Sequence, residues 1–152
     1  MNLIHFTEDL IAPCGMNCGI CSSYLAFKYN VKQKGIKIPC CKGCRPRGKL
    51  CAFLKKKCSL LLNNSIQYCH QCNDFPCKNL NGIDKRYRTL YRMSMVENLS
   101  AIKAKGIEVF LREQEETWKC PECGEVICCH NGVCFNCGIE IIKRRKQKYR
   151  WE

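Results

Sequence analysis

Five C-x-x-C pairs give this chain its chemistry, because two thiolate sulfurs three positions apart can hold one edge of a tetrahedral metal ion. Seventeen of the 152 residues are cysteine. Two such pairs close a four-sulfur zinc site, with S–Zn distances of about 2.3 Å. The pairs are Cys18 with Cys21, Cys41 with Cys44, Cys69 with Cys72, Cys120 with Cys123, and Cys134 with Cys137. The spacing therefore predicts a protein that metal ions hold together.

The last two pairs predict a two-knuckle zinc ribbon in residues 119–142. Both have the form C-x-x-C-G, and we expect Gly124 and Gly138 to supply the positive φ that turns backbone N–H groups toward the sulfurs. Short antiparallel strands would join the knuckles. The predicted ligands are Cys120, Cys123, Cys134 and Cys137, and the predicted strand residues are Val126, Ile127, Val133 and Phe135.

Cys128, Cys129 and His130 fall at the tip of this expected hairpin. We interpret them as spare residues and not as ligands. The alternative is that Cys128 and Cys129 form an exposed redox site or an accessory metal site.

Residues 1–80 hold eleven cysteines, enough for two four-sulfur sites with three left over. The spacing does not decide which of these cysteines share an ion. We therefore assign as ligands the three C-x-x-C pairs, together with Cys14 before the first pair and Cys77 after the last. With the ribbon, this gives two or three zinc ions. The predicted ligands in this part are Cys14, Cys18, Cys21, Cys41, Cys44, Cys69, Cys72 and Cys77, and the further candidates are Cys40, Cys51 and Cys58.

An iron–sulfur cluster is the alternative cofactor, because soft thiolates bind iron clusters as readily as zinc. Cys14, Cys18 and Cys21 reproduce the C-x-x-x-C-x-x-C triplet of radical S-adenosylmethionine enzymes. Such enzymes need a large barrel, which this chain is too short to build. Iron–sulfur or thiol redox chemistry without that reaction therefore stays open as the second function.

The chain shows no sign of export, which argues against a disulfide framework. Residues 1–12 carry Glu8 and Asp9 and lack the apolar core of a secretory signal. No apolar run reaches the roughly 18 residues of a membrane span. We therefore expect a cytoplasmic protein with reduced thiols and no membrane partner.

The formal net charge of +13 suggests a polyanionic partner, but thiolates must be counted too. Each four-thiolate zinc site adds −2, so three sites would lower the charge to about +7. Two interpretations of the basic residues stay open: they bind nucleic acid, or they only balance the thiolate charge and solvate the chain end. The candidate nucleic-acid-binding residues in the tail are Lys143, Arg144, Arg145, Lys146, Lys148 and Arg150.

Helical patterns occupy most of the remaining sequence. We expect helices over residues 22–34, 50–63, from 78 into the basic stretch near 93, from a cap at Ser94 to Gly106, and over 107–118. The predicted fold class is small α+β. The predicted domains are a cysteine-rich helical metal-binding domain at 1–118, the zinc ribbon at 119–142 and a basic tail at 143–152.

The order of motifs resembles a widespread bacterial and archaeal cysteine-rich family of unknown function that is presumed to bind zinc. The segments APCGMNCGICSSYLA, CCKGCR and YCHQCNDFPCKNL carry the resemblance, followed by TWKCPECG and CFNCG. It implies architecture and metal binding but no activity. Since the sequence also shows no hydrolytic constellation, we predict no catalytic residue. We interpret the chain as a structural zinc-binding protein and as a binding or regulatory module with an unknown protein or nucleic-acid partner.

Overall fold

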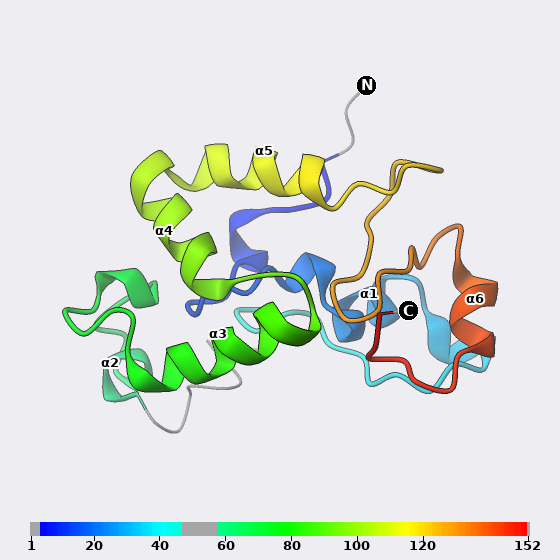
Figure 1. Cartoon of the computed structure of the whole chain (residues 1–152), viewed down its shortest axis with the longest axis horizontal. Helices are drawn as coiled ribbons and strands as arrows, with labels where there is room; N and C mark the ends of the chain where they lie inside the picture. Colours follow the sequence, from blue (N-terminus) through cyan, green and yellow to red (C-terminus); the bar gives the residue numbers. More distant parts are fainter. Residues whose placement is uncertain (1–3, 47–57, 152) are drawn as a thin grey trace.

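The computed structural model describes residues 4–46 and 58–151, and within them the chain is mostly helical (Figure 1). Helices α4 and α5 form an arc on one side, and α3 runs beneath it. Helices α1 and α6 lie at the opposite end. The α-helices are α1 (Ser22–Lys28), α2 (Ser59–Leu62), α3 (Lys78–Leu90), α4 (Met95–Lys105), α5 (Ile107–Thr117) and α6 (Ile139–Arg144). The 3₁₀ turns are η1 (Glu8–Leu10), η2 (Cys18–Ile20), η3 (Val31–Lys34) and η4 (Cys69–Gln71).

The predicted α+β class and the predicted zinc ribbon are not confirmed, because the described residues form only isolated β-bridges. Two of these bridges lie in the expected hairpin, Lys119 with Val126 and Ile127 with Cys134. The chain turns between the two residues of the second bridge, where the Gly132 N–H donates to the Cys128 carbonyl at 2.8 Å. Each arm is therefore too short to extend a ladder beyond one pair of residues.

The long central helices follow the local signals in the sequence. Ser94 caps α4, since its hydroxyl accepts from the Glu97 backbone N–H at 3.0 Å. Gly106, with φ of 88°, separates α4 from α5. The helix predicted over 22–34 is interrupted, because Asn30 adopts a left-handed φ of 52° and the chain continues as η3. Most of the helix predicted over 50–63 lies outside the described residues, and α2 is the part that they include.

The core joins the two ends of the sequence. Ile11, Ile20 and Leu25 are fully buried in the same hydrophobic cluster as Phe110 and Phe135. A backbone hydrogen bond of 2.9 Å connects Cys129 N–H to the Ile20 carbonyl. Residues near 130 therefore pack directly on the first cysteine segment.

One buried carboxylate fixes α3 against the start of α4. The Asp84 residue is only 2% exposed. Its oxygens accept from the Ser94 hydroxyl at 2.7 Å and from the Val96 backbone N–H at 3.0 Å, and the Arg88 Nε lies 2.8 Å away. The carboxylate thus receives charge-assisted hydrogen bonds from both helices.

Gly15 stands where the first cysteine segment touches α4. Its φ is +90°, and a Cβ atom there would lie 2.6 Å from the Met95 carbonyl oxygen and 2.8 Å from Leu99 Cγ. Gly35 has a similar φ of +81°, but a Cβ atom would meet nothing within 4 Å. The two glycines therefore differ mainly in the space around them.

We expect Gly15→Ala to lower the free energy of unfolding by about 2–4 kcal/mol, the sum of backbone strain and steric overlap. Gly35→Ala should cost only the strain, about 1–2 kcal/mol. Urea denaturation of both variants tests the difference. Equal losses would show that α4 moves aside at no cost.

No helix among the described residues is long and apolar enough to cross a membrane.

Candidate metal centre

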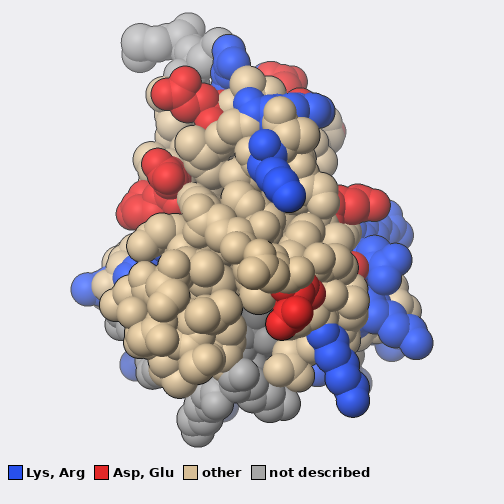
Figure 2. Space-filling model, turned by 90° about the vertical axis from the view of Figure 1, so that its left-hand side faces the viewer, with Lys and Arg blue, Asp and Glu red and all other residues tan. Residues whose placement is uncertain are grey.

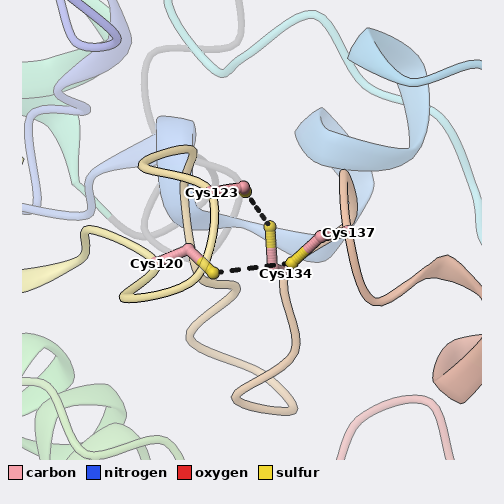
Figure 3. Close-up of side chains that lie close together, drawn as sticks. All are labelled: Cys120, Cys123, Cys134 and Cys137. Carbon is pink, nitrogen blue, oxygen red and sulfur yellow. Dashed lines mark hydrogen bonds between the residues drawn. The ribbon is translucent and has the colours of Figure 1, made fainter.

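Four cysteine sulfurs meet where the chain leaves α5 and folds back toward α6 (Figure 3). We call Cys120, Cys123, Cys134 and Cys137 the C-terminal cluster. Cys120 Sγ lies 3.7 Å from Cys137 Sγ, and Cys123 Sγ lies 3.5 Å from Cys134 Sγ. All four sulfurs lie within 4.8 Å of one another. Among the described residues, no other group of three or more candidate ligands is this compact.

The spacing of these sulfurs fits one tetrahedral ion. Four ligands about 2.3 Å from a central zinc ion would be about 3.8 Å from one another. The two sulfur–sulfur distances of 3.5 and 3.7 Å are close to that edge length, whereas a disulfide bond would be near 2.05 Å. The C-terminal cluster can therefore bind a metal ion without a large rearrangement.

Two glycines shape the knuckles in different ways. Gly124 has a φ of +80°, as the sequence predicts. The positive φ predicted for Gly138 is wrong, since its φ is −105°. Gly138 is instead needed for space, because a Cβ atom there would lie 2.7 Å from the Cys134 carbonyl oxygen and 2.8 Å from Val133 Cγ1.

Hydrogen bonds prepare one thiol of the cluster for ionisation. Desolvation raises the pKa of Cys123, but hydrogen bonds outweigh it. The Asn136 side-chain amide, 3.6 Å from the sulfur, and the Glu125 backbone N–H are the largest of these, and the pKa falls to about 7. The hydrogen bond with the Cys120 thiol, followed by the one with Cys123, raises the pKa of Cys137 to about 12. One thiolate is therefore favoured, and a bound cation is needed to ionise all four. Asn136 is a functional residue that was not predicted, although its place between Cys134 and Cys137 could have indicated it.

The cysteines of the N-terminal half fall into two regions. Cys58, Cys69, Cys72 and Cys77 line one cavity of about 230 Å³, and the Cys77 sulfur, at the N-cap of α3, accepts from the Leu80 N–H at 3.5 Å. Cys14 does not line that cavity and is 1% exposed. The second region lies beside α1. There the Cys44 backbone N–H lies 3.5 Å from the Cys18 sulfur, and the thiols of Cys21 and Cys41 lie in the same region.

The remaining candidates stand apart from these groups. Cys40 is exposed, and its thiol donates weakly to the Ile38 carbonyl at 4.0 Å. Cys51 lies outside the described residues. The structure holds no disulfide among the cysteines that it describes.

A family model matches the segment that holds these thiols. Residues 10–82 match the family Protein of unknown function (DUF3795). The match confirms the predicted resemblance in this segment, which holds the eleven cysteines from Cys14 to Cys77 and ends before the C-terminal cluster. Comparisons with curated proteins and with solved structures found no match. Below, residues 10–82 are called the DUF3795 segment.

His130 and its two preceding cysteines pack against the DUF3795 segment, so the alternative of an exposed redox site at Cys128 and Cys129 is wrong. Cys128 and Cys129 are 0% exposed and His130 is 5% exposed. His130 Nδ1 accepts from the Ser22 backbone N–H at 3.2 Å, which leaves the proton on Nε2, 3.1 Å from the Tyr87 hydroxyl. Neither contact could be predicted from the sequence, because both partners are more than 40 positions away.

We expect His130 to weaken the fold under acidic conditions. Burial lowers the pKa of His130 to about 4, against 6.5 in an unfolded chain. Between these values the unfolded state binds the additional proton, so the free energy of unfolding falls as the pH falls from 6.5 to 4 and then levels off. The full effect is about 3 kcal/mol.

Urea denaturation of the wild type and of His130→Asn at several pH values tests this. The variant loses hydrogen bonds at every pH but cannot titrate, so the difference between the two proteins should shrink below pH 6.5. Thiol protonation affects both proteins alike. A constant difference would contradict the buried neutral imidazole.

Two basic side chains of the tail donate hydrogen bonds to backbone carbonyls of the molecule. The Arg145 guanidinium donates to the Asn131 carbonyl at 2.9 Å, and the Lys148 ammonium donates to the Ile142 carbonyl. Trp151 Nε1 donates to the Cys129 carbonyl at 2.6 Å, which returns the tail from α6 toward the centre of the molecule (Figure 1). Of the six candidate basic residues of the tail, Lys143, Arg144, Lys146 and Arg150 stay exposed.

The face shown in Figure 2 is largely neutral, and its coloured lysines and arginines lie mainly along one edge with acidic residues among them. Within the residues drawn in colour, this face presents no continuous basic patch. Nucleic-acid binding by the tail stays a prediction.

Proposed function

We propose that this chain is a structural zinc-binding protein in which the C-terminal cluster holds one zinc ion. The observation that carries the proposal is the closed set of four sulfurs within 4.8 Å. All four donors are thiols that become thiolates when a metal ion binds. Such soft ligands in a tetrahedral set select zinc or iron over hard cations. The reducing compartment predicted from the sequence favours the redox-inert ion.

The ligand set supports a structural role for the zinc. Catalytic zinc sites keep one position for water or substrate, whereas structural sites use four protein ligands. Here four cysteines fill every tetrahedral position. The ion would therefore fix the shape of the surrounding loops, and the function is that of a binding or regulatory module with a preformed surface.

Native mass spectrometry of protein purified under reducing conditions tests the proposal. The wild type should carry zinc, and Cys123→Ser should carry one zinc ion fewer, because it removes one exposed ligand of the cluster. Cys40→Ser is the matched control, since Cys40 is also exposed and lies outside the cluster. An unchanged zinc count in Cys123→Ser would reject the proposal. Iron with acid-labile sulfide would instead support the iron–sulfur alternative.

A further inference from the structure

Two knuckles of the DUF3795 segment face each other beside α1. The first is η2, where the Cys21 N–H donates to the Cys18 carbonyl at 3.0 Å. The second follows the Cys40–Cys41 doublet, and Gly43 gives it a φ of +106°. Each knuckle has the C-x-x-C spacing that directs two sulfurs to one side of a turn.

Two hydrogen bonds hold these knuckles together across more than 15 positions of sequence. The Cys44 backbone N–H donates to the Cys18 sulfur at 3.5 Å. The Cys41 backbone N–H donates to the Ser23 carbonyl at 3.0 Å, at the start of α1. The second knuckle is thus fixed at both of its ends against the first.

Backbone donors surround the sulfurs in the way that metal-bound thiolates require. The Gly43 N–H donates to the Cys41 sulfur at 3.3 Å. A hydrogen bond with the Cys44 thiol, followed by burial, raises the pKa of Cys18, so these two thiols are in contact. Burial also raises the pKa of Cys21, and the backbone N–H groups of Ser23 and Tyr24 oppose that rise. Backbone N–H groups therefore point at the sulfurs of Cys18, Cys21 and Cys41.

The position of the second knuckle is also fixed by the residue that follows it. Arg45 Nε donates to the Ile11 carbonyl and its Nη2 donates to the Gln67 carbonyl, both at 2.6 Å. The guanidinium lies 4.8 Å from the centre of the Tyr68 ring. Cys44 therefore belongs to a loop that is bound to three other segments of the fold.

We propose that Cys18, Cys21, Cys41 and Cys44 form a second four-thiolate zinc centre. The proposal rests on the structural zinc role proposed for the C-terminal cluster, and it extends that role to the DUF3795 segment. It selects Cys41 over its neighbour Cys40, whose thiol turns to the Ile38 carbonyl. These four sulfurs form a more open group than the C-terminal cluster, so we expect this zinc to be released first.

The adjacent cysteines provide a matched pair of variants. In native mass spectra, Cys41→Ser should hold one zinc ion fewer than the wild type, and Cys40→Ser should hold the full number. Cys123→Ser reports separately on the C-terminal cluster. A loss in Cys123→Ser without a loss in Cys41→Ser would overturn the second centre alone. A loss in Cys41→Ser without one in Cys123→Ser would overturn the C-terminal cluster alone.

Alkylation of the wild type gives the same information when Cys41→Ser does not fold. Under native conditions iodoacetamide should modify Cys40 quickly, whereas Cys18, Cys21, Cys41 and Cys44 should react only after a chelator removes the zinc. Peptide mass mapping reads each site. Equal rates at Cys40 and Cys41 in the zinc-loaded protein would overturn the proposal.

Discussion

Chelation of zinc is expected to lower the melting temperature of the protein more than any single substitution in its core. Structural zinc contributes apparent binding free energies of about 10–16 kcal/mol in zinc-finger peptides. That is as large as the whole stability of a typical domain, about 5–15 kcal/mol. The C-terminal cluster lies directly beside core residues, since Val126 and Phe135 are 2% and 0% exposed. Loss of the ion should therefore release the core around these residues as well as the knuckles.

Thermal unfolding followed by circular dichroism, with and without a chelator and always with a reducing agent, measures the effect. Cys40→Ser should behave as the wild type, and added zinc should restore the original melting temperature. If the chelated protein melts at the same temperature as the loaded one, the ion has no structural role.

The second large effect is expected at the carboxylate between α3 and α4. Asp84→Ala removes the acceptor for the Ser94 hydroxyl and the Val96 N–H and leaves the Arg88 guanidinium without its counterion. Because the Arg88 side chain is itself 57% exposed, the cost comes mainly from the Ser94 hydroxyl and the Val96 N–H that lose their acceptor, about 1–3 kcal/mol for each group. Urea denaturation of Asp84→Ala should show a loss of this size.

An exposed ion pair in the same half of the molecule is the control. Lys105 Nζ lies 2.9 Å from Glu113 Oε1, and both side chains are about half exposed (53% and 46%). Glu113→Ala should change the free energy of unfolding by about 0–1 kcal/mol, because water screens the pair. Similar losses in the two variants would mean that burial does not strengthen the Asp84 contacts.

The sequence predicts the helices well where the signal is local. Ser94 and Gly106 mark the bounds of α4 because a cap and a positive φ act on neighbouring residues. The same holds for the C-terminal cluster, whose members the C-x-x-C spacing identifies as neighbours. The left-handed backbone conformation of Asn30 could not be predicted, since the helical pattern of the sequence continues on both sides of this residue.

The features that the sequence could not predict depend on distant partners. Cys128, Cys129 and His130 look like an exposed turn because they fall midway between the two C-x-x-C pairs, yet Ser22 and Tyr87 hydrogen-bond to the histidine. Gly138 looks like a left-handed residue, but the contact with Cys134 decides its role. The grouping of the N-terminal thiols depends in the same way on which loops come together in space. The spacing of the cysteines in the sequence does not show this.

The hydrogen bonds of Ile20 and Ser22 have a consequence for biosynthesis. Their partners, the Cys129 N–H and His130 Nδ1, are translated more than 100 residues later. Contacts that are so far apart in sequence form slowly, because a long loop must close before they contribute. While the ribosome is still making the intervening helices, the thiols around Cys18 and Cys21 are not yet covered by their final neighbours. The thiols of a nascent chain are therefore accessible to oxidants and alkylating reagents until the polypeptide is long enough to fold.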